Sequence, residues 1–183
     1  MAVLRASIKA AGYADHEWEL IVCDNASEDG TATFAASAGA TVVYEPQRQI
    51  ARARNSGAAA ASGPWLLFVD ADTTPSARLL HATRRLMESG NCCAGGALID
   101  GAELTFLTRI LLGTWNAFSR TLGLACGAYI FCRREAFVDL GGFSTQLHAA
   151  EELDICARLR RLGARAWRET CDHHRCTAKH VNA

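Results

Sequence analysis

The sequence predicts an α/β fold in which a mostly parallel β-sheet is flanked by helices. Between residues 19 and 88, short apolar segments alternate with helical ones, which is the order of βαβ units in a parallel sheet. The segment 65–69 is apolar, aromatic and β-branched and lies between Pro64 and Pro75, which favours a strand buried on both faces. With 183 residues, half of them apolar, the chain is expected to form a single domain, 1–183, with a sizeable core.

The N-terminal half is predicted to alternate between helices and strands. Apolar residues at helical spacing predict a helix over 2–11, which Gly12 ends, so that residues 1–18 amount to a truncated N-terminal helix. Ser27 is placed to cap the helix that follows it. The predicted strands are 19–23, 41–44 and 65–69, and the predicted helices are 31–38, 49–61 and 76–88.

The second half has a weaker pattern. Its clearest element is a helix over 149–162, in which apolar side chains face inward and arginines face outward. The segment 104–124 is mostly apolar and predicts a helix packed on the sheet or lying over the site. Residues 164–183 are expected to be an irregular tail. The remaining predicted elements are strands over 94–99 and 127–132, a helix over 134–140 and a turn at 141–143.

Composition excludes several classes of function. The 19 basic and 19 acidic residues balance to a formal net charge of zero, so the sequence predicts no nucleic-acid partner. Eight scattered cysteines without a signal peptide are typical of a reduced, cytoplasmic protein. No apolar run reaches transmembrane length, because Arg109 and Arg120 interrupt the longest candidate.

Two aspartates, Asp70 and Asp72, directly follow the predicted strand 65–69. Because ligands of open parallel sheets bind beyond the carboxyl ends of the strands, both carboxylates are expected at a binding site. Carboxylates this close repel each other unless a cation lies between them, and their oxygens suit Mg²⁺ or Mn²⁺ held partly by substrate phosphates. Asp24 ends the strand 19–23 in the same way and would line the same sheet edge if the two strands are neighbours. The structural alternative is a solvated turn that caps the next helix.

Four blocks follow one another along the chain. They read DNASEDGT at 24–31, ARARNSG at 51–57, VDADTTP at 69–75, and GAYIFCRREAFVDLGGF at 127–143 followed by AAEELDICARLRRLG at 149–163. These blocks resemble the motifs of family 2 glycosyltransferases, which have the Rossmann-like GT-A fold. Each block alone is weak, but together they cover residues 19–163 in the family's order, which makes the resemblance specific.

The resemblance implies an inverting transferase that moves a sugar from a nucleotide-diphosphate-sugar donor, a UDP- or GDP-sugar, to an acceptor hydroxyl. Asp72 would hold Mg²⁺ or Mn²⁺ against the diphosphate, and Asp70 would face the ribose or the metal. The metal would neutralise the charge that grows on the leaving nucleoside diphosphate. A tail histidine, His173 or His174, would be a third metal ligand. The nucleotide-sugar-binding residues would be Asp24, Asn25, Ser27, Asp29, Arg52, Arg54, Asn55 and Asp70.

The resemblance also implies a general base for the acceptor hydroxyl, at the second position of an acidic pair. Glu152 occupies that position, where the family has an aspartate, and a glutamate offers the same chemistry with a longer reach. Glu151 and Asp154 are close rivals, since they share one helix face while residue 152 points elsewhere. The structural alternative is that the cluster only decorates a helix N-terminus, where negative charge contributes ~0.3–1 kcal/mol.

Structural alternatives also exist for the other motif residues. Ser27 and Asp29 would then only build a turn, and Arg52 and Arg54 would only form a solvated helix face. The Cys/His-rich tail has a spacing that matches none of the usual structural zinc patterns, so a zinc site there is a lesser alternative.

The short N-terminus departs from the family, whose members begin with a strand, a loop and a full helix before the first block. An exposed sheet edge where that strand belongs predicts a homodimer. A truncated, inactive remnant that acts as a binding module is the main alternative function. A haloacid-dehalogenase-like phosphatase is more remote: DADTT fits its start, but only Lys179 follows, with no suitable aspartate pair.

The acceptor side is expected in the segment 104–124 and in the tail. Trp115, Phe118 and nearby leucines would meet a lipid-linked acceptor, which would place the protein peripherally at the inner face of the membrane. A saccharide acceptor, with these side chains in the core, is the alternative.

Overall fold

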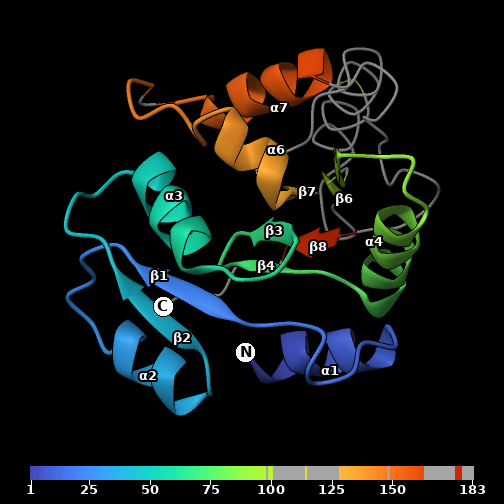
Figure 1. Ribbon diagram of the computed structural model, residues 1–183. Coiled ribbons are helices and arrows are strands. Elements are labelled where there is room, and N and C mark those ends of the chain that lie inside the picture. The colour runs from blue at the N-terminus through green and yellow to red at the C-terminus, as the bar shows by residue number, and fades with distance from the viewer. Residues whose placement is uncertain (98, 101–113, 115–127, 148, 163–175, 179–183) are drawn as a thin grey trace.

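The computed structural model describes residues 1–97, 99, 100, 114, 128–147, 149–162 and 176–178 (Figure 1). Its helices are α1 (Ala2–Ala10), α2 (Thr31–Ser37), α3 (Ile50–Ala60), α4 (Ala77–Glu88), α6 (Arg134–Asp139) and α7 (Glu151–Leu162). Its strands are β1 (Ile21–Asp24), β2 (Thr41–Tyr44), β3 (Trp65–Val69), β4 (Thr73–Thr74), β5 (Ala94–Gly96), β6 (Ile99–Asp100), β7 (Tyr129–Arg133) and β8 (Cys176–Ala178). Apart from Thr114, the helix expected over 104–124 lies outside the described residues.

The strands form three hydrogen-bonded groups, which confirms the α/β class. β1 and β2 pair in parallel, as expected of two strands joined through one helix, α2. β7 lies between β3 and β5 and is antiparallel to both, so β3 and β5 run in the same direction with α4 connecting them. In the third group, β8 is antiparallel to β4 and parallel to β6.

Strand direction is therefore more mixed than the βαβ order predicts. The crossover rule fixes the direction of strands joined by a single helix, and it holds for β1–β2 and for β3 and β5. It does not constrain β7, which returns between β3 and β5 after the long segment 101–127. Among the described strands β1 pairs with β2 and β3 with β7, so no described ladder joins the strand of Asp24 to the strand that precedes Asp70.

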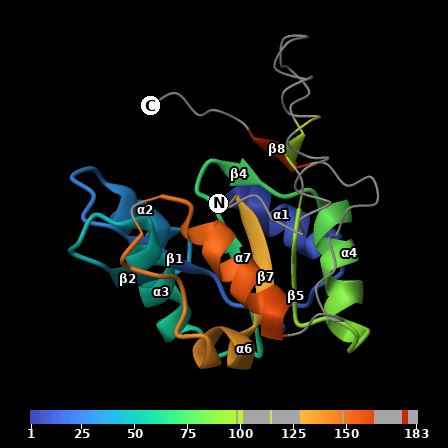
Figure 2. The same cartoon turned by 90° about the horizontal axis from the view of Figure 1, so that it is seen from above.

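Two hydrophobic clusters cover the two faces of the β3–β7–β5 group. Alternate residues of β7 belong to different clusters: Ile130 and Cys132 pack with α3, α6 and α7, whereas Tyr129 and Phe131 pack with α1 and α4. Figure 1 shows α6 and α7 on one side of the strands and α1 on the other, and Figure 2 shows α7 lying over β7. β3 is covered on both faces as predicted, although Leu67 keeps 38% of its surface exposed.

The tail differs from the expectation of irregular structure. Residues 176–178 form β8, whose Ala178 and Thr177 lie opposite Thr73 and Thr74 of β4. The sequence signal is weak here, because three residues are too few to show a period of two. The pairing brings the C-terminal segment to the residues that directly follow Asp72, while the rest of the tail lies outside the described residues.

The described cysteines include both buried and half-buried thiols. Cys23, Cys92, Cys93, Cys132 and Cys156 are all free. Burial raises the pKa of Cys132 to about 12, with a smaller contribution from its neighbours Cys93 and Cys156. This thiol is therefore protonated and packs as a small apolar side chain. None of the described helices is long and apolar enough to cross a lipid bilayer.

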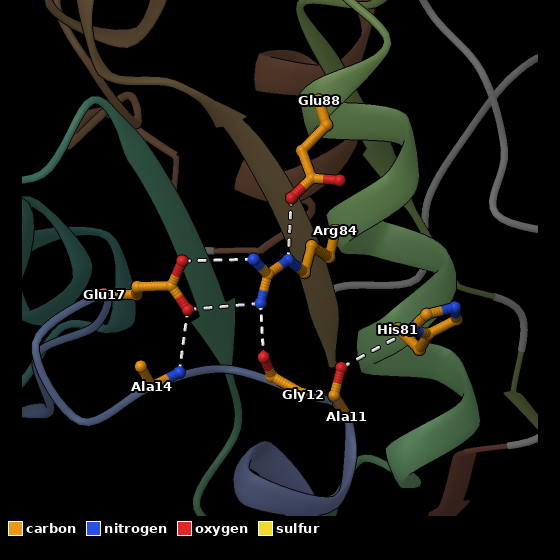
Figure 3. Close-up of polar contacts among 7 residues, drawn as sticks. All are labelled: Ala11, Gly12, Ala14, Glu17, His81, Arg84 and Glu88. Atoms are coloured by element: carbon orange, nitrogen blue, oxygen red, sulfur yellow. Dashed lines mark hydrogen bonds and ion pairs between the residues drawn. The ribbon is translucent and has the colours of Figure 1, made fainter.

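Arg84 of α4 fastens the segment between α1 and β1 to the domain (Figure 3). Its guanidinium donates to both carboxylate oxygens of Glu17, at 3.1 and 3.2 Å, and to the carbonyl oxygen of Gly12 at 2.5 Å. The guanidinium carbon of Arg84 also lies 4.9 Å from the centroid of the Tyr13 ring. Arg5 lies over the ring of Trp18 at a similar distance, 5.1 Å. Gly12 directly follows Ala11, the C-cap of α1, so the hydrogen bond from Arg84 to Gly12 holds the end of α1 against α4.

Glu17 makes the stability of this connection dependent on pH. The backbone N–H of Ala14, and then Arg84, lower the pKa of the Glu17 carboxyl below its ordinary value of 4.5. A carboxyl with a lowered pKa in the folded state stabilises the protein above the unfolded-state pKa, and this contribution is lost as the pH falls through the lower folded-state value. We expect Glu17→Gln to lower the melting temperature at pH 7, and to lower it by less as the pH falls below 4.5, as measured by circular dichroism.

Candidate functional site

The site begins at the turn that follows β3. The backbone N–H of Thr73 donates to the carbonyl oxygen of Asp70 at 2.9 Å, which closes a four-residue turn with Asp70 at its first position and Asp72 at its third. Aspartate is favoured at the first position of such turns. The side chain of Asp70 is 41% exposed and Asp72 is exposed. Both carboxylates are therefore accessible to a ligand from solvent.

Arg54 of α3 joins this turn to the start of α7. One guanidinium nitrogen, Nη2, donates to Oδ1 of Asp70 at 2.8 Å, and the other, Nη1, donates to Oε1 of Glu151 at 3.1 Å. The side chains of Arg54 and Glu151 are only 12% and 7% exposed. Arg54 is therefore not part of a solvated helix face. It is a nearly buried cation that holds two carboxylates from separate parts of the chain.

Asn55, the next residue of α3, fixes the turn beneath Arg54. Its side-chain amide donates to the carbonyl oxygen of Phe143 and its side-chain oxygen accepts from the Phe143 N–H, both at 2.9 Å. The Arg54 guanidinium lies over the Phe143 ring at 5.3 Å. Through these contacts α3 positions the backbone of the turn and the ring against which Arg54 packs.

Gly142 and Gly141 offer a matched test of this turn. Both have left-handed backbone, with φ of 71° and 73°, but a Cβ on Gly142 would lie 2.6 Å from Oδ1 of Asn55 while a Cβ on Gly141 meets nothing within 4 Å. We expect Gly141→Ala to cost about 1–2 kcal/mol from backbone strain alone. Gly142→Ala should cost clearly more in urea denaturation, because it also displaces the Asn55 amide. Equal losses would mean that the Asn55 contact contributes nothing.

The three acidic candidates of α7 have different environments. Glu151 is buried against Arg54, and Asp154 pairs with Arg158 at 2.7 Å. Glu152 is half-buried and lies in the first turn of the helix. The helix starts after Ala150, whose φ of 63° turns the chain, and the Ala150 carbonyl oxygen accepts from the N–H groups of Leu153 and Asp154. Glu151 and Asp154 therefore both carry a cationic partner in this structure.

The residues after β1 build a tightly bonded loop. Asp24, only 6% exposed, accepts from the Ser27 N–H at 3.1 Å, and Asn25 donates to the carbonyl oxygens of Glu45 and Gln47. The side chain of Asp29 accepts from both the N–H and the hydroxyl of Thr31 at the start of α2.

Ser27 does not cap α2 as predicted. The N-cap residue is Gly30, and no side chain accepts a hydrogen bond at that position. The capping chemistry comes instead from Asp29, one residue earlier, because its carboxylate accepts from the backbone N–H of Thr31, the first residue of the helix. Ser27 and Asp29 thus have local structural roles in the described loop, and Ser27 is exposed.

Arg52 points differently from Arg54. Its Nε donates to the side-chain oxygen of Gln49 at 3.1 Å, consistent with two helix positions that lie on opposite faces. Gln49 in turn donates to the carbonyl oxygens of Thr145 and Leu147. The sequence offered no signal for this role of Gln49, since its partners lie almost a hundred residues away.

Arg158 of α7 holds the same turn from the other side. Its guanidinium donates to the carbonyl oxygens of Leu140 and Gly142, at 2.7 and 2.6 Å, in addition to Asp154. Sequence reasoning placed the arginines of this helix on its outer face, and Arg158 is an exception because the turn provides unpaired carbonyl oxygens. The segment 140–147 is therefore bonded to both α3 and α7.

The donor set suits a metal that is completed by a substrate. Within the described ranges, no group of three or more His, Cys, Asp or Glu side chains is arranged to hold a metal ion. Asp70 and Asp72 supply accessible carboxylates, and Mg²⁺ or Mn²⁺ commonly takes one or two carboxylates with the rest of its ligands from water and phosphates. The residues fit such a shared ion better than a closed protein cage. His173 lies outside the described residues.

Comparison with known proteins identifies the family. The model of glycosyl transferase family 2 matches residues 2–141. An uncharacterized glycosyltransferase of Mycobacterium tuberculosis is 32% identical over 137 residues, which cover 72% of this chain and 61% of that protein. The pre-mycofactocin glycosyltransferase of the same species is 29% identical over 132 residues, which cover 63% of this chain and 27% of that protein. The chain thus spans less than two thirds of the length of these relatives.

Solved structures share the fold. Staphylococcus aureus TarS in complex with UDP-GlcNAc superposes with a TM-score of 0.76 at 17% identity, over 100% of this chain and 55% of that one. The mannosyltransferase PcManGT of Pyrobaculum calidifontis, in complex with GDP-Man and Mn²⁺, superposes with a TM-score of 0.71 at 21% identity, over 96% and 52%. The matched family region contains Asp24, Arg54, Asp70 and Asp72. The chain belongs to glycosyltransferase family 2 and has the GT-A fold of these transferases.

Proposed function

We propose that this chain transfers a sugar from a nucleotide-diphosphate-sugar donor to an acceptor hydroxyl with the help of a divalent metal ion. The observation that carries the proposal is the accessible Asp70–Asp72 turn, which Arg54 joins to the acidic start of α7 in a chain of this family. The bound nucleotides of TarS and PcManGT support a UDP- or GDP-sugar donor, and the Mn²⁺ of PcManGT supports a metal of that kind.

Asp70 and Asp72 would hold Mg²⁺ or Mn²⁺ beside the donor diphosphate. The bound ion would offset the negative charge that develops on the leaving nucleoside diphosphate. Asp24 is buried at the carboxyl end of β1, where its carboxylate orders the loop that would face the nucleotide. Arg54 fixes the side chain of Asp70, and Asn55 fixes the backbone of Phe143, so both shape the site through other residues.

Glu152 is the proposed general base. Of the three acidic candidates in the first turn of α7, Glu151 and Asp154 are each paired with an arginine, and Glu152 is half-buried beside them. Its carboxylate would remove the proton from the acceptor hydroxyl as that oxygen bonds to the anomeric carbon of the sugar. The bond to the diphosphate oxygen breaks on the opposite side, so the configuration at the anomeric carbon is inverted.

Calorimetric titration of the folded chain tests the donor site. UDP, GDP and their common sugar conjugates are titrated with and without Mn²⁺, and one nucleotide is expected to bind with metal dependence. We expect Asp72→Asn to reduce binding in Mn²⁺ to the level measured without it, because a neutral amide is a weaker ligand for a hard cation. Ser144→Ala, a small change at a half-buried position of the 144–147 loop, is the control and should bind like the wild type.

The same titration separates the enzyme from a non-catalytic remnant. If the chain is folded by circular dichroism but binds no nucleotide with or without Mn²⁺, the proposed function is wrong. A remnant that serves as a binding module would then be the better account of the fold.

A further inference from the structure

Glu151, Arg54 and Asp70 come from distant parts of the sequence and form two linked ion pairs. One end of this network is buried and the other is exposed. Glu151 is 7% exposed, Arg54 is 12% exposed and Asp70 is 41% exposed. Glu151 is thus the enclosed end, and Asp70 is the end that a solute can reach. Arg54 lies between them, with one guanidinium nitrogen on each carboxylate.

We propose that Arg54, anchored by Glu151, is a positioning residue that sets how tightly Asp70 binds a divalent cation. The inference rests on the proposed function, in which Asp70 and Asp72 hold the metal. Nη2 of Arg54 lies 2.8 Å from Oδ1 of Asp70. An incoming cation therefore competes with the Arg54 guanidinium for this carboxylate oxygen. In the absence of the ion, Arg54 also offsets the repulsion between the two aspartates.

Other contacts keep Arg54 in place. Its guanidinium lies over the Phe143 ring at 5.3 Å, and Phe143 is bonded through both its backbone groups to Asn55 of α3. Glu151 cannot leave the guanidinium without becoming an unpaired buried charge, which is strongly unfavourable. Asp70 is at the exposed end, so water can solvate its carboxylate when Arg54 is not bound to it. The ion pair that a divalent cation can replace is therefore the one with Asp70.

Two substitutions should shift cation affinity in opposite directions. Glu151→Gln removes the carboxylate that shares Arg54 with Asp70, so the charge of Arg54 acts on Asp70 alone. The site also loses one negative charge. Both effects weaken cation binding. The double variant Arg54→Met with Glu151→Met removes one charge of each sign. The net charge of the site is unchanged and Asp70 is released, so cation binding should strengthen.

The test measures the binding of Mn²⁺ alone, without nucleotide, from the free Mn²⁺ signal in electron paramagnetic resonance at 0.1 M KCl (about a 10 Å screening length). We expect roughly three- to tenfold weaker binding for Glu151→Gln and roughly five- to thirtyfold tighter binding for the double variant. The control is Arg48→Met with Glu28→Met, which removes an ion pair whose side chains are 64% and 85% exposed. It should bind Mn²⁺ like the wild type.

The outcomes distinguish this inference from the proposed function. If the wild type binds Mn²⁺ together with UDP or GDP but the double variant binds Mn²⁺ no more tightly than the wild type, the inference is wrong and the proposed function stands. If Glu151→Gln binds Mn²⁺ more tightly, the inference is also wrong, and this variant decides alone should the double variant not fold. If the wild type binds neither Mn²⁺ nor nucleotide, both are wrong.

Discussion

Glu152→Gln should lower turnover by about 100- to 10,000-fold, the usual contribution of a general base, while donor binding stays near the wild-type value. The amide cannot accept a proton, but it has nearly the shape of the carboxylate and keeps the first turn of α7 intact. Transfer is measured by release of UDP or GDP in the presence of an acceptor, and donor affinity by calorimetry. Glu152→Asp should restore part of the lost turnover, because it returns the carboxylate with a shorter reach.

The rival assignments give different results. If Glu152→Gln keeps full turnover and Asp154→Asn loses it, the base is Asp154. If neither variant loses turnover, neither Glu152 nor Asp154 is the base. Glu151→Gln is less informative on this point, since it disturbs Arg54 as well.

Arg54→Met should destabilise the fold by about 3–5 kcal/mol, because it leaves Glu151 as an unpaired, nearly buried charge. The free energy of unfolding is measured by urea denaturation. Adding Glu151→Met should recover most of this loss, since replacing both members of a buried ion pair with apolar side chains is often neutral or stabilising. The double-mutant cycle therefore isolates the coupling between the two residues.

Arg48→Met is the matched control for this prediction. Its side chain and that of its partner Glu28 are mostly exposed, so the loss should stay below about 1 kcal/mol. An equally small loss for Arg54→Met would show that the Arg54–Glu151 pair does not stabilise the fold. The inference that Arg54 holds the Asp70 turn to the start of α7 would then be wrong.

Local pattern was enough to predict most of the fold. The strand over 65–69 and the helices over 31–38 and 76–88 appear in the structure within a residue or two, because their apolar spacing and their flanking glycines and prolines are local signals. The antiparallel insertion of β7 between β3 and β5 was not predicted. Nothing local specifies the neighbours of a strand that returns after a long intervening segment.

The candidate site was predicted as a set of residues but not as a network. Motif resemblance placed Arg54, Asp70 and Glu151 near the site, but no local pattern indicates that one guanidinium lies between two carboxylates. The contacts of Asn55 and Gln49 could not be predicted either. Both side chains bond to backbone groups of 143–147, and backbone groups carry no sequence signal. Glu151 was a rival for the base, and its pairing with Arg54 indicates a structural role.

The metal site is tested by a ¹H–¹⁵N spectrum of the chain in the presence of UDP or GDP and a small amount of Mn²⁺. Paramagnetic broadening falls off steeply with distance from the ion, so it locates the ion in the fold. We expect the strongest broadening at the amides of residues 70–73 and clear broadening at the start of α7, with no such effect when Mg²⁺ replaces Mn²⁺. Broadening centred elsewhere, with residues 70–73 unaffected, would contradict the assignment of Asp70 and Asp72 as the metal site.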